Sequence, residues 1–219
     1  MSYPKQDEQV NLSHSFARFW QQQLEAANPP ATLPSGNRSP VLSGQTARVA
    51  FPLPAWEGFL QVQQLSAMAV LLGAWALLLH RYHGSPDGVV VAMATEAGLL
   101  PLSLAVAEET AVADWLKQAA AQYAACLTHQ APLHDIQTWT GLPEDWFTFS
   151  GAVQVESTLP TLALPLLVSL QDEAIHVVYD VAWMTETAVA HLVGHLQTIL
   201  TNIVNHPHSP LCRHRAADG

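Results

Sequence analysis

The chain has 219 residues, of which 49% are hydrophobic and only 12% are charged, and its formal net charge is −10. This length allows one large domain or two small ones, and it is enough to bury a sizeable core. The excess of acidic over basic residues, 18 against 8, repels phosphate backbones and anionic lipid. We therefore expect neither nucleic acid nor a membrane surface as a partner.

The cysteines and the first residues indicate the compartment. Cys126 and Cys212 are too few for a disulfide framework, and they lack the spacing of a metal site. The first 14 residues contain no basic region followed by an apolar one, so no signal peptide is predicted. We expect a cytoplasmic protein, and the low share of charged residues suggests that part of its surface is normally covered.

The N-terminal quarter alternates between helix and extended chain. Residues 1–12 are polar, and we expect them to be flexible. Residues 13–27 place aromatic side chains on one face, which predicts a helix. Residues 28–43 contain four prolines and predict an extended connector. Apolar residues then alternate over 44–53, and this pattern predicts a strand.

The most apolar stretch follows a short amphipathic helix at 55–64 and begins after Ser66, which can N-cap it. No residue from 67 to 79 is charged or strongly polar, so this helix must be enclosed by protein or lipid. The run is shorter than the roughly 20 apolar residues that cross a bilayer, and we predict a buried core helix. The Gly, Pro and Asp residues at 84–88 end it, and 89–95 predicts a strand covered on both faces.

The second half begins with a strand at 99–106 and an alanine-rich helix at 110–127, followed by a turn and a short helix at 129–136. The period then changes to two, and three strands are predicted, at 148–157, 162–170 and 175–181. The last two strands are expected to form a hairpin.

Thr185 can cap a final helix over 186–204, and residues 206–219 are expected to be a linker toward a following domain. The order of strands and helices predicts an α/β fold, a two-layer sandwich with a mixed sheet, in one domain from residue 13 to 205.

Several segments together resemble the C-terminal half of a nonribosomal peptide synthetase condensation domain. They cover residues 16–211 in the family's order and read FWQQQL, SAMAVLLGAWALLLHRYHG with the VVVA that follows, LPLSLAV, THQAP, and YDVAWMTETAVAHLVGHLQTILTNI ending in HPHSPL. The positions that match family motifs are Arg81, His129, Gln130, Pro132, Tyr179 and Asp180. The resemblance implies a chloramphenicol acetyltransferase-like half-domain. A condensation domain has two such lobes with the active site between them.

The sequence also departs from the family. The catalytic signature, two histidines followed by three residues and Asp-Gly, belongs to the N-terminal lobe and does not occur in this chain. Residues 96–99 stand where the family has a longer bridging loop, and the connection at 157–162, where a second bridging segment is expected, is also short. Both features that would hold a partner lobe are therefore weakened.

Two groups of histidines could be taken for reactive sites. Residues His83 to Gly88 spell His-x-x-x-Asp-Gly, but the string closes a buried helix and precedes a strand, so we interpret it as a turn. His191 and His195 stand four apart on the last helix and could hold zinc. No third ligand is evident beside them in the sequence, and we favour solvent-facing histidines.

The segment from His129 to Pro132 and three later aromatic residues have structural interpretations of their own. His129 is interpreted as the end of a helix, with its side chain near the last carbonyls and a proline stop after it. Trp139, Trp146 and Phe147 are either core plugs or interface anchors, and the core is favoured. No nucleophile elbow, Walker loop or dinucleotide fingerprint occurs, so no cofactor is expected.

These patterns lead us to expect a noncatalytic, truncated condensation-like domain in a peptide synthetase of antibiotic or other secondary metabolism. Its partners would be adenylation and carrier-protein domains, and the start at Met1, just before the lobe boundary, fits this expectation. The alternative is a split condensation enzyme that forms amide bonds only with a separate N-terminal lobe. A homodimer through the face left open by the missing lobe is a third hypothesis.

Overall fold

The computed structural model describes residues 6–33, 41–52, 56–84, 88–155 and 164–214. The strands are β1 (Thr46–Pro52), β2 (Val89–Thr95), β3 (Gly98–Leu104), β4 (Ala152–Gln154), β5 (Leu166–Gln171) and β6 (Ala174–Asp180). The helices are α1 (Gln6–Leu24), α2 (Glu57–Gln63), α3 (Ala67–His83), α4 (Val112–Thr128), α5 (Leu133–Thr140) and α6 (Glu186–Asn205), with the 3₁₀ turns η1 (Glu144–Phe147) and η2 (Leu211–His214).

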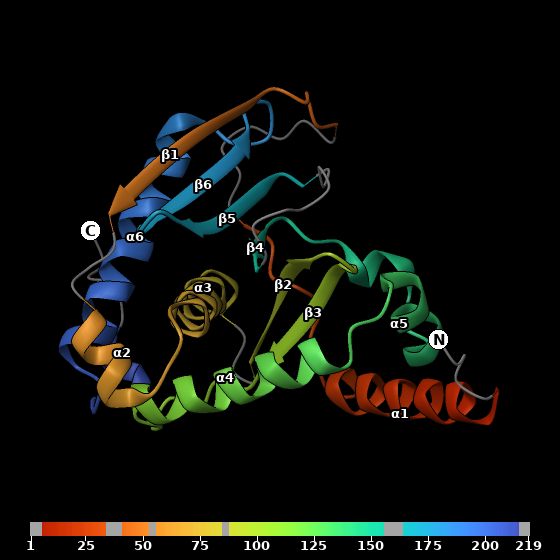
Figure 1. Cartoon of the computed structure of the whole chain (residues 1–219). Helices are drawn as coiled ribbons and strands as arrows, with labels where there is room; N and C mark the ends of the chain where they lie inside the picture. The colour runs from red at the N-terminus through yellow and green to blue at the C-terminus, as the bar shows by residue number, and fades with distance from the viewer. Residues whose placement is uncertain (1–5, 34–40, 53–55, 85–87, 156–163, 215–219) are drawn as a thin grey trace.

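The strands form one mixed sheet in the order β1-β6-β5-β4-β2-β3. Its central strands β5, β4 and β2 are parallel, and the outer pairs on both sides are antiparallel. Figure 1 shows the sheet curling around α3, which is seen end-on. The predicted α/β sandwich with a mixed sheet is confirmed.

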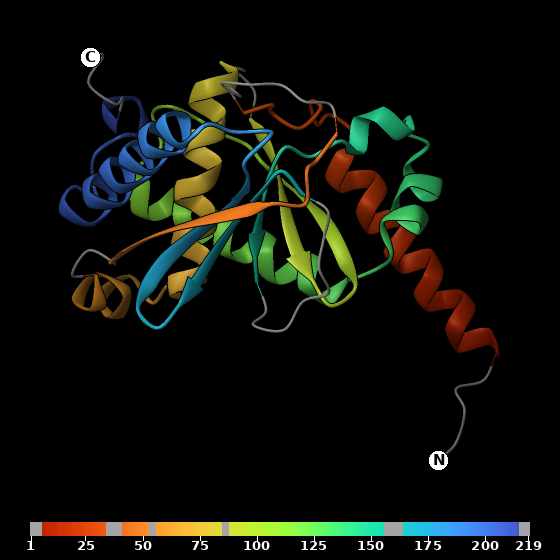
Figure 2. The same cartoon turned by 90° about the horizontal axis from the view of Figure 1, so that it is seen from above.

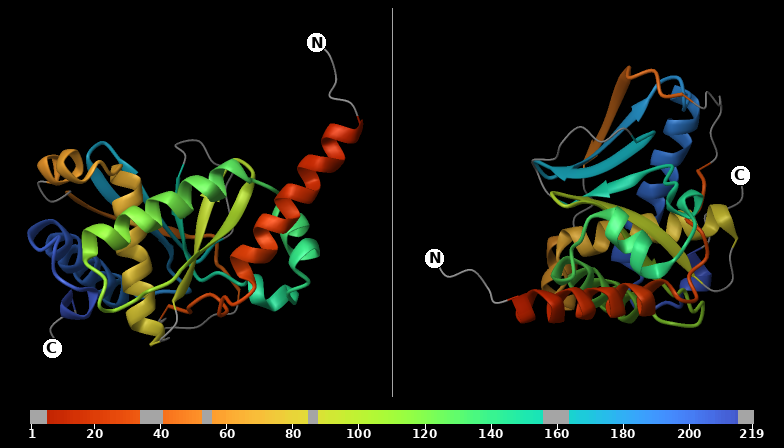
Figure 3. Two further views of the ribbon diagram at one scale, coloured as in Figure 1. Left: turned by 90° about the horizontal axis from the view of Figure 1, so that it is seen from below. Right: turned by 90° about the vertical axis from the view of Figure 1, so that its right-hand side faces the viewer.

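Helix α3 is the centre of the core, as its composition predicts. The Ser66 hydroxyl accepts a hydrogen bond from the backbone N–H of Ala69 at 3.1 Å and caps the helix. Every residue from Ala69 to Leu79 is buried, between the sheet on one side and α4 and α6 on the others. Seen from below, α4 crosses α3 (Figure 3). The apolar helix is therefore enclosed by protein.

The burial of β2 and β6 agrees with the strands predicted over these residues. All seven residues of β2 are buried, because α3 packs against the strand and β3 and β4 pair with its two edges. In β6, Ile175, Val177 and Tyr179 are buried toward the helices, whereas the alternate residues before Asp180 are half-buried. The predicted hairpin of β5 and β6 is present, and its turn places Asp172 and Glu173 at φ 49° and 60°.

Helices α1 and α5 lie together beyond the β3 edge of the sheet (Figure 2). Trp20 of α1 is completely buried, and its indole Nε1 donates to the carbonyl oxygen of His129 at 2.9 Å. Helix α1 begins at Gln6, inside the polar segment 1–12 and before the start of the helix predicted over 13–27. Its first residues, QDEQ, include two acidic ones, which favour the start of a helix through the helix dipole. These polar residues show no apolar periodicity, so the pattern did not predict a helix over them.

One strand prediction needs correction. The period-two pattern over 148–157 predicts a longer strand than β4, whose three residues are limited by a short pairing with both neighbours. Residues 206–212, the first part of the expected linker, return to the start of α4 and bury Leu211. The predicted second bridging segment at 157–162 lies outside the described residues.

Candidate functional site

The histidine string after α3 is part of a helix end. Gly84 takes the left-handed conformation at φ 66°, and its N–H donates to the carbonyl oxygen of His80 at 2.8 Å. Gly88, at φ 144°, lies so close to β3 that a Cβ there would be 2.5 Å from the carbonyl oxygen of Leu104. Residues 85–87 lie outside the described residues. Burial lowers the pKa of His80 in the last turn of α3.

The family-motif position His129 joins three helices. It ends α4, and its Nδ1 donates to the carbonyl oxygen of Ala125 at 2.9 Å. Its ring stacks on Phe19 of α1, with ring centroids 4.1 Å apart and planes 7° from parallel. Pro132 then precedes α5. His129 therefore has a structural role where α4, α1 and α5 meet, in agreement with its interpretation as a helix end.

A second motif pair, Tyr179 and Asp180, ends β6. Oδ1 of Asp180 accepts from the Ser43 hydroxyl at 3.0 Å and from the Ala182 N–H at 2.9 Å, and Oδ2 accepts from the Gly44 N–H at 2.9 Å. Burial by itself would raise the pKa of this carboxyl, but these hydrogen bonds outweigh it and hold the pKa below its ordinary value. The carboxylate therefore fastens the chain entering β1 to the end of β6.

The remaining candidates lie apart from these two places. Arg81 is half-buried in the last turn of α3, and Gln130 is half-buried in the short α4–α5 connection. Neighbouring Tyr82 is linked to His195 of α6 by a 2.7 Å hydrogen bond between its hydroxyl and Nδ1. His191 is exposed, and no three potential metal-ligating residues of the described chain lie together. The structure thus distributes the candidate residues instead of gathering them into one site.

The three aromatic residues after the α4–α5 connection divide between core and surface. Trp146 and Phe147 are 6% and 9% exposed and pack edge-to-face against each other at 4.9 Å. Both side chains are part of the hydrophobic core, and neither is exposed for contact with another protein. Trp139 is half-buried, and its carbonyl oxygen accepts from the Gln21 side chain at 2.8 Å.

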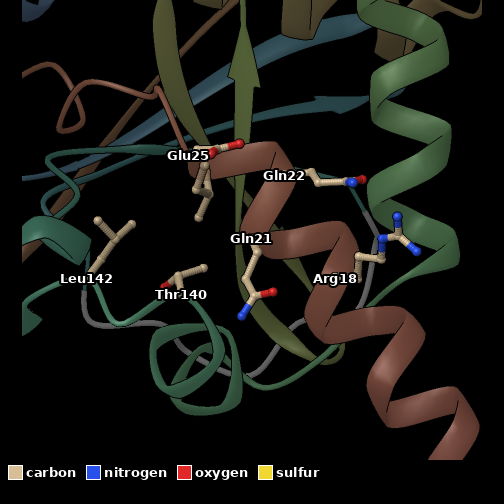
Figure 4. A pocket seen from close by; sticks show the side chains of 7 residues that line it. Arg18, Gln21, Gln22, Glu25, Thr140 and Leu142 are labelled. Carbon is tan, nitrogen blue, oxygen red and sulfur yellow. The ribbon is translucent and has the colours of Figure 1, made fainter.

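A surface hollow lies between α1 and the end of α5, and no pattern in the sequence predicted it. It measures about 500 Å³ and is lined by Arg18, Gln21, Gln22, Leu24, Glu25, Thr140 and Leu142. In Figure 4, Gln21 extends toward α5, whereas Arg18 extends to the other side of α1. The lining offers hydrogen bonds and one charge of each sign but no nucleophile paired with a base. Its one signal in the sequence is the polar face of the first predicted helix.

The connection between β2 and β3 is a tight turn. Thr95 pairs with Gly98 across the hairpin, and the Thr95 hydroxyl donates to the Gly98 carbonyl oxygen at 3.0 Å. Only Glu96 and Ala97 lie between the strands. This is the position at which the family resemblance implies a longer bridging loop.

No single helix of the described chain is long and apolar enough to cross a membrane, and α2 and α3 reach that length only as a pair bent by 97°. No protein-family model matches the chain.

The chain is similar in sequence to short parts of very large synthetases. It is 28% identical over 211 residues to chondramide synthase cmdD of Chondromyces crocatus, a match that includes 81% of this chain and 5% of that protein. It is also 28% identical over 182 residues to a component of the linear gramicidin synthase of Brevibacillus parabrevis, covering 71% of this chain and 2% of that protein.

Solved structures share the fold at lower identity. The starter condensation domain of rhizomide synthetase RzmA superposes with a TM-score of 0.71 at 16% identity, over 92% of this chain and 54% of that one. The X-domain solved in complex with OxyB from teicoplanin biosynthesis gives a TM-score of 0.75 at 16% identity, over 95% and 56%. The chain spans about half of these structures. It has the fold of the condensation domains of nonribosomal peptide synthetases, consistent with the C-terminal lobe of such a domain.

Proposed function

We propose that this chain is a noncatalytic, truncated condensation-like domain that serves as a scaffold or protein-interaction surface beside the adenylation and carrier-protein domains of a peptide synthetase. The observation that supports the proposal best is the two-residue turn between β2 and β3, at the place where a bridging loop would reach a second lobe. A lobe without this loop has less surface with which to hold a catalytic partner.

Two further observations agree with an interaction role. The sequence contains no pair of adjacent histidines, so the family's catalytic signature is not supplied by these residues. Among the proteins of similar fold, the X-domain from teicoplanin biosynthesis forms a complex with OxyB. A condensation-type fold can therefore present a docking surface to another protein.

The test removes the lobe from a synthetase that contains it. Deleting residues 1–205 is expected to reduce the yield of folded protein, the rate of adenylation or the binding of a partner domain. The purified chain alone, mixed with aminoacyl-loaded carrier proteins, is expected to form no amide bond. If yield, adenylation and partner binding all stay at the level of the intact synthetase, the scaffold proposal is wrong.

A split condensation enzyme is the second candidate, and it is favoured by one observation. The chain matches only 54% to 55% of the starter condensation domain of rhizomide synthetase RzmA, which leaves room for a complement of comparable size. A separate lobe carrying the His-His-x-x-x-Asp-Gly signature would supply the missing half. Peptide formation from loaded carriers in the reconstituted mixture, but with neither half alone, would support this candidate over the scaffold.

A further inference from the structure

The C-terminal segment 206–212 supplies the cap that α4 lacks. A helix begins with N–H groups that have no acceptor within the helix, and a side chain usually provides one. The residue before α4 is an alanine and offers none. Instead, the N–H of Val112 donates to the carbonyl oxygen of Ser209 at 3.1 Å, and the N–H of Ala113 donates to that of Pro207 at 2.8 Å.

The same segment is bound in return by the loop before α4. The N–H of Leu211 donates to the carbonyl oxygen of Thr110 at 3.1 Å, and the N–H of Cys212 donates to that of Glu108 at 3.0 Å. The Leu211 side chain is 5% exposed. It is the one buried residue of 206–212, so the segment has a single buried apolar anchor.

The start of α4 is connected directly to the core helix. One turn beyond its first residue, the Trp115 indole donates to the carbonyl oxygen of Ala105 at 2.8 Å. Leu116 packs where Gly73 of α3 allows close approach. In Figure 1 the start of α4 lies beside the C-terminal end of the described chain. The end of α4 that residues 206–212 cap is therefore also held by α3 and by the loop before α4.

We propose that residues 206–212 form a releasable strap that detaches as one local unit and frees the first amides of α4, while α4, α3 and α6 stay folded. Segments with few buried apolar side chains open at lower free energy than the core, and the strap has one such side chain. This inference is independent of the proposed scaffold role. It implies that binding to, or tension on, the C-terminal segment uncaps the first turn of α4.

Hydrogen exchange measured by NMR on the full chain tests the coupling. The amides of Val112, Ala113, Leu211 and Cys212 are expected to exchange with one common opening free energy. Replacing the anchor, Leu211→Asp, should speed all four by at least about tenfold and leave α3 and α6 at wild-type rates. His208→Ala is the matched control, because His208 lies in the strap with an exposed side chain, and it should change none of them.

A reciprocal variant removes the bond from the helix side. Val112→Pro deletes the N–H that Ser209 accepts, and proline is well tolerated at the first position of a helix. Exchange of Leu211 and Cys212 should then accelerate, and this variant decides the matter if Leu211→Asp fails to fold.

Three outcomes overturn the proposal. The first is wild-type protection of Val112 and Ala113 in Leu211→Asp. The second is equal loss of protection in α3 and α6 in that variant. The third is unchanged exchange of Leu211 and Cys212 in Val112→Pro.

Discussion

Replacing Gly73 by alanine tests the tightest contact of the core. An added Cβ would collide with the Leu116 side chain and lie 3.2 Å from the Trp115 ring. Both side chains are at most 1% exposed, so neither has free space into which to move. Overpacking of this kind costs about 1–3 kcal/mol, whereas exchanging glycine for alanine inside a helix gains about 0.5–1 kcal/mol. We expect Gly73→Ala to lower the free energy of unfolding by roughly 1–2 kcal/mol.

The assay is urea and thermal unfolding of the purified chain, followed by circular dichroism. For a chain of this size, the loss corresponds to a fall in Tm of about 2–8 °C. Gly194→Ala is the matched control, because no atom lies within 4 Å of a Cβ at that position of α6, and it should stabilise the chain by about 0.5–1 kcal/mol. In the double variant Gly73→Ala/Leu116→Ala, the loss should be smaller than the sum of the single losses. If Gly73→Ala stabilises the chain as much as Gly194→Ala does, the close approach of α3 and α4 is refuted.

Three further perturbations test individual side chains. Asp180→Asn should lower Tm at neutral pH. Because the pKa of the carboxyl is lowered in the folded chain, the higher Tm of the wild type should be present above pH 3.8 and should vanish as the pH falls through the folded pKa. A difference in Tm that does not vary with pH would contradict this. Burial lowers the pKa of His80 below 6.5, so the unfolded chain binds the proton first and stability should decline as the pH drops below 6.5. Urea titrations of His80→Gln over this range should give a shallower decline, and an identical slope would exclude His80 as its source. His129→Ala removes the stack on Phe19 and the hydrogen bond to Ala125, so it should lower the free energy of unfolding by about 1–2 kcal/mol. Hydrogen exchange should become faster in α1 more than in α3, and an equal increase in both helices would argue against a role of this residue in holding α1 to α4.

Much of the local structure could be predicted because it depends on neighbours in the sequence. Ser66 and Thr185 cap α3 and α6 as expected, since a cap needs only a hydroxyl and an N–H three residues later. The helix predicted over 186–204 is present as α6, Glu186–Asn205. The turn interpretation of the string from His83 to Gly88 rests on the same kind of local chemistry, and Gly84 and Gly88 both have positive φ.

The candidate site was less predictable because its parts come from distant segments. Asp180 is in a motif of the sequence, yet its partners Ser43 and Gly44 lie more than 130 residues away. The hollow beside α1 requires α5 to pack across it, and nothing in either helix alone indicates this contact. Whether Trp146 and Phe147 lie in the core or at the surface depends on the tertiary position of η1, where both are buried.

Most of the helices and strands, the buried helix that follows Ser66 and the resemblance to a condensation lobe could all be predicted from the chain alone, because periodicity, caps and motif order are local properties. The position of β4 between β2 and β5, the start of α1 at Gln6 and the return of residues 206–212 to cap α4 became apparent only in the folded structure. Hydrogen bonds such as that from Ala113 to Pro207 join residues that are far apart in the sequence and carry no local pattern. They form only when the whole chain is folded.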